Sequence, residues 1–82
     1  MTSYFDWTAN PEPDVVSYNL YYGLVSGVYL GHTNTANLFV TITGLRNGLL
    51  YYFALTALDA AANESVFSDE ITVLTKIARV RI

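Results

Sequence analysis

The sequence predicts an all-β protein, a β-sandwich of two packed sheets. Short segments of alternating apolar and polar residues recur along the chain, and none of them sustains the 3.6-residue period of an amphipathic helix. Pro, Gly and Asn separate these segments, as turn residues separate the strands of a sandwich. With 82 residues, the chain is long enough for one small domain and too short for two.

Two strands are expected in the first part of the chain, over residues 3–8 and 15–22. A loop at residues 9–14 separates them, because it contains two prolines and proline cannot donate a hydrogen bond to a strand ladder. Alternation assigns one side of each strand to the core, with Trp7 near its centre. The inward positions are Ser3, Phe5, Trp7, Val16, Tyr18, Leu20 and Tyr22.

The next part of the chain is expected to contain a short strand and a longer one. A turn at Ser26-Gly27 leads to the short strand at Val28-Tyr29-Leu30, which Gly31 closes. Residues 32–37 are polar and are expected to be a connection. Residues 38–43 alternate again, and the inward positions there are Leu38, Val40 and Ile42.

The segment Gly44–Ala57 reads as a turn followed by a strand. Asn47-Gly48 supplies the turn, because both residues tolerate positive φ. Leu45 can plug the bottom of the sandwich, and the phenol of Tyr51 can reach back to the loop backbone and fix the corner. The inward face of this strand is Tyr51, Phe53, Leu55 and Ala57, and the outward face is Tyr52, Ala54 and Thr56.

The last part of the chain is expected to contain a loop, a strand and a strand-like tail. The loop covers residues 59–65 and the strand covers residues 66–75, with Ile71 and Val73 as its inward pair. Residues 76–82 form a basic tail in which apolar and charged residues also alternate. The expected organisation is therefore a sandwich over residues 1–75 followed by a tail at 76–82.

The composition favours a protein that makes contacts with other proteins. Hydrophobic residues make up 52% of the chain and charged residues only 13%, whereas about a quarter of the residues are charged in ordinary soluble domains. A small domain cannot bury so much apolar surface, so some of it should remain exposed at an interface. A well-packed monomer with a polar Thr/Ser/Asn face is the alternative.

Charge and hydropathy argue against several other classes. The net charge is −3, and three of the four basic residues lie in the tail, so no basic face is available for nucleic acid. No apolar run is long enough to span a membrane. The chain has no cysteine, so no disulfide is expected.

These motifs, in this order, resemble a fibronectin type III domain of the bacterial and phage type. The resemblance implies an immunoglobulin-like sandwich with strands B, C, C′, E, F and G, and it makes Tyr51 the corner tyrosine. The matching segments are Phe5-Asp6-Trp7-Thr8, Asn10-Pro11-Glu12-Pro13-Asp14-Val15, Tyr18-Asn19-Leu20-Tyr21-Tyr22-Gly23, Thr43-Gly44-Leu45-Arg46-Asn47-Gly48, Tyr51-Tyr52-Phe53-Ala54-Leu55-Thr56-Ala57, Asn63-Glu64-Ser65 and Ser68-Asp69-Glu70.

The resemblance leaves the family's first strand, A, without a counterpart. Strand B would then have an open edge, which a protein must pair or protect. The tail can supply the missing strand, either to its own domain or to a neighbouring chain. Donation to a neighbour is easier to picture, because the end of strand G lies far from the start of strand A in this family. Pairing within the chain and a frayed tail stay open as well. The contact residues are Ile77, Arg79, Val80, Arg81 and Ile82.

Tyr21, Tyr29 and Tyr52 are the other candidate contact residues, on the outer face of one sheet. Adjacent outward tyrosines can form stabilising cross-strand pairs, anchor a protein partner or stack on sugars. The sequence leaves all three interpretations open.

No catalytic, cofactor or metal site is expected. The single histidine, His32, has no Cys, Asp or Glu close to it in sequence and is read as a surface residue. Asp59, Asn63 and Glu64 share a loop and have oxygen ligands for a cation, but capping of a hairpin is the preferred reading. Glu12 and Asp14 are read as solvated charges.

The expected function is that of a non-enzymatic structural or interaction module. The resemblance and the short chain favour a small virion component, a phage capsid decoration or tail accessory protein, which binds another protein or further copies of itself. The alternative is a spacer or carbohydrate-binding fibronectin type III module of a secreted bacterial glycoside hydrolase. Neither nucleic acid nor membrane is an expected partner.

Overall fold

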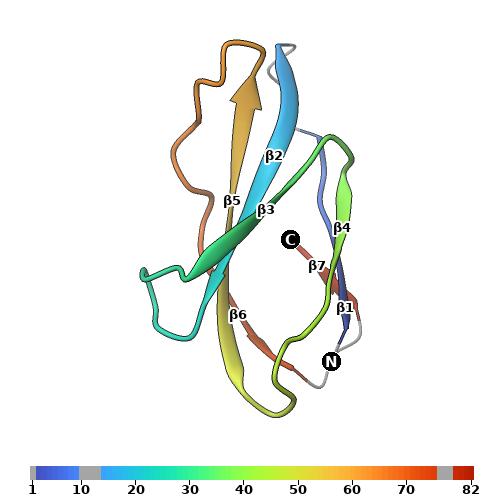
Figure 1. Ribbon diagram of the computed structural model, residues 1–82, viewed down its shortest axis with the longest axis vertical. Coiled ribbons are helices and arrows are strands. Elements are labelled where there is room, and N and C mark those ends of the chain that lie inside the picture. The colour runs from blue at the N-terminus through green and yellow to red at the C-terminus, as the bar shows by residue number, and fades with distance from the viewer. Residues whose placement is uncertain (1, 10–13, 76–78) are drawn as a thin grey trace.

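The computed structural model describes residues 2–9, 14–75 and 79–82, and these residues form two β-sheets that pack face to face (Figure 1). The described residues contain no helix, so the prediction of an all-β sandwich is confirmed at this level. They include no helix with the length and apolar character needed to cross a bilayer. The strands are β1 (Ser3–Asp6), β2 (Val15–Gly23), β3 (Gly31–Thr35), β4 (Phe39–Ile42), β5 (Leu50–Asp59), β6 (Ile71–Leu74) and β7 (Arg79–Arg81).

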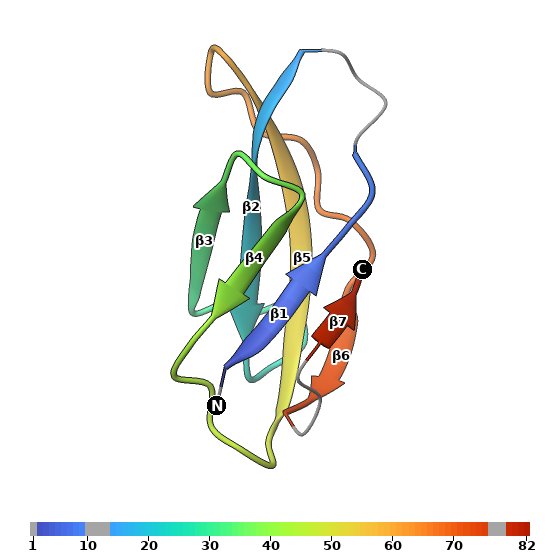
Figure 2. The ribbon, with the colours of Figure 1, turned by 90° about the vertical axis from the view of Figure 1, so that its right-hand side faces the viewer.

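One sheet has three strands in the order β4-β1-β7, and the other has four in the order β3-β2-β5-β6 (Figure 2). Neighbouring strands are antiparallel except for β1 and β7, which are parallel. The long strands β2 and β5 form the centre of the four-stranded sheet, opposite β1 of the other sheet.

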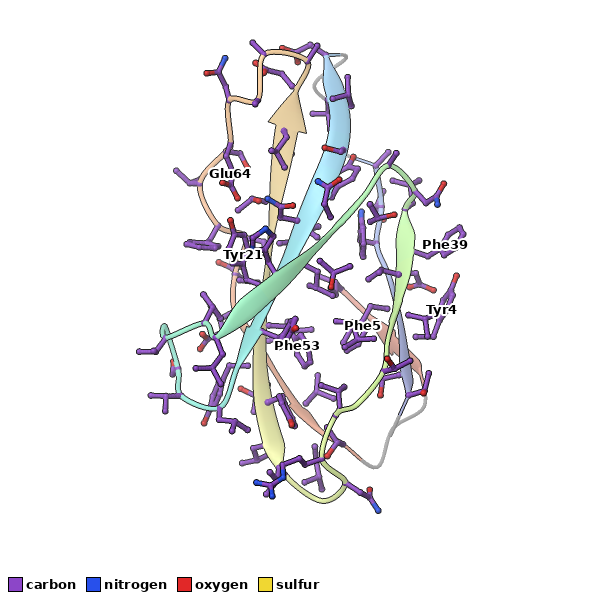
Figure 3. All side chains as sticks on the ribbon, viewed as in Figure 1. Tyr4, Phe5, Tyr21, Phe39, Phe53 and Glu64 are labelled. Carbon is purple, nitrogen blue, oxygen red and sulfur yellow. The ribbon has the colours of Figure 1, made fainter. Side chains whose placement is uncertain are left out.

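The core lies between the two sheets and is centred on a pair of phenylalanines. Phe5 from β1 and Phe53 from β5 are both fully buried, and their ring centroids are 4.5 Å apart. Figure 3 shows the two side chains pointing toward one another from opposite sheets. Most of the predicted core is confirmed as buried, whereas Leu55 is only half-buried against it. The confirmed residues are Trp7, Tyr18, Leu20, Leu45, Tyr51 and Phe53.

The predicted corner before β5 is present. Leu45 is buried, and the backbone N–H of Arg46 donates to the Tyr51 hydroxyl at 3.0 Å. Gly48 has φ of 80°, as the predicted turn requires. Thr75 also holds this loop in place. Its hydroxyl donates to the Arg46 carbonyl and accepts a hydrogen bond from the Leu49 N–H.

The prediction that Val16 faces the core is wrong. A β-bulge between Val15 and Ser17 shifts the register of β2 against β5, and the alternation therefore restarts at Ser17. Val15 packs against the core instead, and Val16 is 51% exposed.

The strand that follows β2 is also displaced from its predicted position. Val28-Tyr29-Leu30 is not a regular strand; Val28 only forms an isolated bridge with Val25. The polar segment that was expected to be a connection contains β3, which pairs with β2 from Tyr18 to Tyr22. Hydrogen bonds hold this strand in place: the Asn34 amide donates to Asn19 Oδ1 at 3.0 Å.

The predicted strand at 38–43 is β4, with Val40 and Ile42 buried but Leu38 40% exposed.

The predicted strand at 66–75 is shorter than expected. Only β6 is regular, and its inward residues are Ile71 and Val73 as predicted. Ahead of it, Ser65 and Ser68 attach the chain to the edge of β5. Each serine donates its backbone N–H to a β5 carbonyl at 2.8 Å and accepts a β5 N–H on its hydroxyl at 2.9 Å. Serine side chains thus replace part of the backbone ladder here.

The C-terminal tail pairs with β1 of its own chain. The register is Tyr4 with Arg79, Phe5 with Val80 and Asp6 with Arg81, and the Ile82 N–H donates to the Asp6 carbonyl at 2.8 Å. Of the arrangements that the sequence left open for the tail, this single chain contains pairing within its own domain. The side chain of Ile82 packs against the core.

The direction of β7 fits pairing within the chain. Figure 2 shows β6 running toward the end of the sandwich where β1 begins, and β7 running alongside β1 in the same direction. Of the predicted contact residues, Ile77 lies outside the described residues.

Candidate functional site

The outer face of the four-stranded sheet carries the predicted tyrosines, and the segment 60–70 between β5 and β6 runs alongside it (Figure 1). This segment contributes Glu64, Phe67 and Glu70, each of which contacts residues of the sheet or of the β2–β3 loop. Because of this cover, Ala54 and Thr56 of β5 are buried although they face away from the core.

Glu64 attaches the segment to the centre of the sheet. Its Oε2 accepts hydrogen bonds from the Tyr21 hydroxyl at 2.5 Å, from the Thr56 hydroxyl and from the Asn19 amide at 3.3 Å. Figure 3 shows Tyr21 and Glu64 on the same side of the sheet. One carboxylate oxygen therefore serves three donors from β2 and β5, which fixes the segment over both strands.

Glu70 attaches the segment to the loop between β2 and β3. Its carboxylate accepts from the Ser26 hydroxyl, from the Gly27 N–H at 2.8 Å and from the Tyr29 hydroxyl at 2.7 Å. Gly27 has φ of 74°, which a turn at this position requires. The loop and the segment are thus joined by three charge-assisted hydrogen bonds.

Four rings pack against one another on this face. We call Tyr21, Tyr29, His32 and Phe67 the Phe67 cluster. The Phe67 ring lies 5.0 Å from Tyr21 at an interplanar angle of 83°, and 5.3 Å from Tyr29 at 48°. His32 is exposed, as predicted for a surface residue, and its ring packs on Tyr21 with a centroid distance of 4.9 Å. Because the rings are tilted against one another, the cluster presents no flat aromatic surface.

Hydrogen bonds around the cluster keep the carboxyl groups of Glu64 and Glu70 ionised and the phenol of Tyr29 protonated at neutral pH. The hydrogen bond from Thr56, followed by that from Tyr21, lowers the pKa of Glu64; the bond from Ser26, followed by that from Tyr29, lowers the pKa of Glu70. Desolvation and then the bond to Glu70 raise the pKa of Tyr29 to about 12. A general acid needs a carboxyl group with a raised pKa, whereas the pKa values of both glutamates are lowered.

These pKa shifts predict that the protein loses stability in acid. The pKa values of Glu64 and Glu70 are lower in the folded chain than in the unfolded chain, so their contribution is complete at neutral pH and is lost from about pH 5 downward. The midpoint of thermal unfolding, measured by circular dichroism from about pH 7 to pH 3, should fall. Glu70→Gln should flatten this dependence, and Asp69→Asn serves as the neighbouring control. An equally steep profile in Glu70→Gln would contradict the assignment.

Asp59 caps its own loop, as the preferred reading predicted. Its Oδ1 accepts the N–H groups of Ala61 and Asn63 at 2.9 Å, and its Oδ2 accepts the Asn63 amide at 3.0 Å. These bonds, first the one from the Asn63 side chain, lower the pKa of Asp59. Glu64 is engaged on the sheet instead, and no group of three or more His, Cys, Asp or Glu in the described part of the chain could hold a metal ion.

Two surface hollows are lined in part by residues of the segment 60–70. The first, of about 310 Å³, has no acid, base or histidine in its lining apart from the phenol of Tyr18. The second, of about 270 Å³, is lined by Asp14, Asp59 and Glu64 among others, but Asp59 and Glu64 are already occupied by the hydrogen bonds above. Glu12 lies outside the described residues.

The structure separates Tyr52 from the other predicted tyrosines. Tyr52 is half-buried on β5 opposite Gly23, and no ring contact with the Phe67 cluster is found among the described residues. Tyr21 and Tyr29 are half-buried rather than fully exposed. The contact partners Phe67 and Glu70 were missed, because residues 66–70 were read as part of a regular strand.

A second aromatic pair was also missed, on the outer face of the three-stranded sheet. Tyr4 of β1 and Phe39 of β4 stack with a centroid distance of 5.8 Å and an interplanar angle of 17°. Figure 3 shows both side chains on the side of the sheet away from the core. The signal was present in the sequence, because Tyr4 alternates with inward residues, but Phe39 could be paired with it only once the register was known.

Comparison with known proteins finds a similar segment in a much longer protein. Over 58 residues, or 68% of the chain, the sequence is 40% identical to an amylopullulanase of Thermoanaerobacter thermohydrosulfuricus. The chain spans 4% of the length of that curated relative. No protein-family model matches the chain, and no solved structure matches it.

Proposed function

We propose that this chain is a non-catalytic accessory module of the fibronectin type III type, which serves a larger secreted enzyme that degrades polysaccharide. The two-sheet arrangement and the hydrogen bond to the Tyr51 hydroxyl at the corner support the family assignment. Secretion and attachment to an enzyme are part of the proposal, and they follow the alternative that the sequence left open.

The observation that carries the proposal is the match to the amylopullulanase. A segment 40% identical to most of this chain makes up a small part of a much longer protein that is named for an enzymatic activity. The name of that relative indicates a polysaccharide as the substrate of the whole protein. A module of this size can accompany such an activity without performing it.

The chemistry of the described surface supports a non-catalytic role. A glycoside hydrolase needs two carboxyl groups beside a substrate cleft, one of them protonated at the working pH. Here the carboxylates of Glu64 and Glu70 have lowered pKa values and are occupied by hydrogen bonds that close the surface. Their role is to hold the segment 60–70 and the β2–β3 loop in place.

The virion role is the weaker candidate. It depended partly on donation of the tail to another copy, and the tail pairs with β1 of the same chain. None of the comparisons names a virion protein, and the match is to an enzyme.

Two measurements on the purified chain test the proposal. Release of reducing sugar from pullulan and soluble starch should not exceed that of buffer, and sedimentation velocity should give a monomer. Hydrolysis that disappears in Glu64→Gln would overturn the non-catalytic assignment. A stable oligomer at micromolar concentration would instead favour an assembly role of the virion type.

A further inference from the structure

We propose that Asn47 is a site of spontaneous deamidation, at which the Asn47-Gly48 turn converts to aspartate and isoaspartate. The inference is independent of the proposed function, because it depends only on the chemistry of this turn and on its surroundings. Asparagine is among the thermolabile residues of proteins, and Asn47 is the one asparagine of the chain that a glycine follows. Both residues are exposed in the loop between β4 and β5 (Figure 1).

The reaction needs only these two residues and water. The backbone nitrogen of Gly48 attacks Cγ of Asn47, so that an N–Cγ bond forms and the Cγ–Nδ2 bond breaks. Ammonia leaves with the proton of the Gly48 N–H, and a five-membered succinimide ring remains. Water then opens the ring at either carbonyl. Opening at Cγ gives aspartate, and opening at the backbone carbonyl gives isoaspartate, in which the main chain runs through Cβ and Cγ.

The structure leaves both reacting groups accessible. Neither Asn47 nor Gly48 takes part in a hydrogen bond in the described part of the chain. Gly48 has φ of 80°, and a Cβ placed on it would meet no atom within 4 Å beyond its neighbours in sequence. No distant segment therefore covers the turn, and glycine has no side chain to hinder the attack of its own nitrogen.

The other described asparagines lack one or both of these features. Three of them donate their side-chain amides to oxygen atoms of the protein: Asn19, Asn34 and Asn63. Asn37 is exposed as well, but Leu38 follows it, and a branched side chain hinders the attack. The reaction should therefore be selective for the turn before β5.

The turn is fixed on both sides, so the two products should differ in their effect on the fold. Before it, the Arg46 N–H donates to the Tyr51 hydroxyl at 3.0 Å. After it, the Leu49 N–H donates to the Thr75 hydroxyl at 3.1 Å, and the Leu49 carbonyl accepts the Thr75 N–H at 3.0 Å. Isoaspartate adds a methylene to the main chain between these fixed points and should disturb the corner. Aspartate keeps the ordinary backbone and should leave the corner intact.

Incubation of the purified chain in mildly alkaline buffer, followed by trypsin digestion and tandem mass spectrometry, tests the site. Cleavage after Arg46 and Lys76 places Asn47 in the fragment 47–76, where it should gain the mass difference between an amide and a carboxyl group. Conversion should be several-fold slower in mildly acidic buffer, because the attacking nitrogen must lose its proton. Asn47→Gln should suppress the change, since glutamine would have to close a larger ring. Asn37→Gln is the matched control and should convert as the wild type does.

The chain unfolded in urea gives the reference rate. The folded chain should convert at a rate within an order of magnitude of it. A folded chain that stays unconverted while the unfolded chain converts fully would show that the turn protects Asn47 and would overturn the proposal. A mass gain in the fragment 47–76 that persists in Asn47→Gln would overturn it too.

Thermal unfolding of the separated products tests the effect on the corner. The isoaspartate form should unfold several degrees below Asn47→Asp, which carries the same added charge on an ordinary backbone. Equal unfolding temperatures would contradict the strain assigned to the added methylene.

Discussion

Phe53→Ala should destabilise the protein by about 3–5 kcal/mol, which is the usual cost of truncating a fully buried phenylalanine. Phe53 has no exposed surface and packs against rings from both sheets: Phe5 at 4.5 Å, Tyr51 at 6.2 Å and Tyr22 at 6.4 Å. A small domain has only about 5–15 kcal/mol of stability in total. Urea denaturation followed by circular dichroism should therefore give a variant that is unfolded or close to it.

Phe39→Ala is the matched control for this change. It removes the same side chain from an edge strand where the ring is 47% exposed, so it should cost about 1 kcal/mol or less. Similar losses for the two variants would show that the core is not centred on Phe53.

Deletion of residues 79–82 should lower the free energy of unfolding by about 2–4 kcal/mol. The deletion removes the backbone hydrogen bonds of β7, each worth about 1 kcal/mol, and the side chain of Ile82 that packs on the core. It also opens the edge of β1, so the shortened chain should associate at high concentration. Urea denaturation and sedimentation velocity measure the two effects.

Ile82→Ala separates the contribution of the side chain from that of the strand. It keeps β7 and should cost only about 1 kcal/mol, without association. If the deletion changed neither stability nor oligomeric state, β7 would contribute nothing to the fold.

The sequence predicted the parts of the fold that depend on local pattern. Alternation places Phe5, Leu20 and Phe53 on inward faces whatever their strands pair with, and all three are fully buried. The corner was equally predictable, because Leu45, the turn and Tyr51 lie within a few residues of one another. Such features need no knowledge of distant segments.

The errors arose where distant pairing overrides local pattern. Val16 follows the alternation of its strand, but the bulge against β5 moves it outward. The polar segment Gly31–Thr35 carries no apolar alternation, and it is a strand because β2 offers it a free edge. Ser65 and Ser68 break the ladder with their side chains, which alternation cannot reveal.

For the candidate sites, the sequence predicted some of the residues but not the contacts between them. The outward position of Tyr21 was recognised from the period of its strand, but the cover by Glu64 and Phe67 depends on the path of the loop. The pairing of Tyr4 with Phe39 depends on the register between β1 and β4. Neither can be read from spacing along the chain.

The path of the tail bears on the proposed function. A tail that pairs with its own β1 closes the sandwich and leaves a self-contained module, as an accessory role requires. A tail that pairs with a neighbour would link copies into an assembly, which is what a virion component does. In this chain β7 pairs with β1 in the parallel register of Phe5 with Val80, which is the first of these two cases.

An isotope-filtered nuclear Overhauser experiment on a mixture of labelled and unlabelled chains tests this pairing most directly. We predict contacts between the backbone protons of Phe5 and Val80 within the labelled chain, and none between labelled and unlabelled chains. Contacts between these residues that appear across the two kinds of chain would show donation of the strand to a neighbour and would contradict the account.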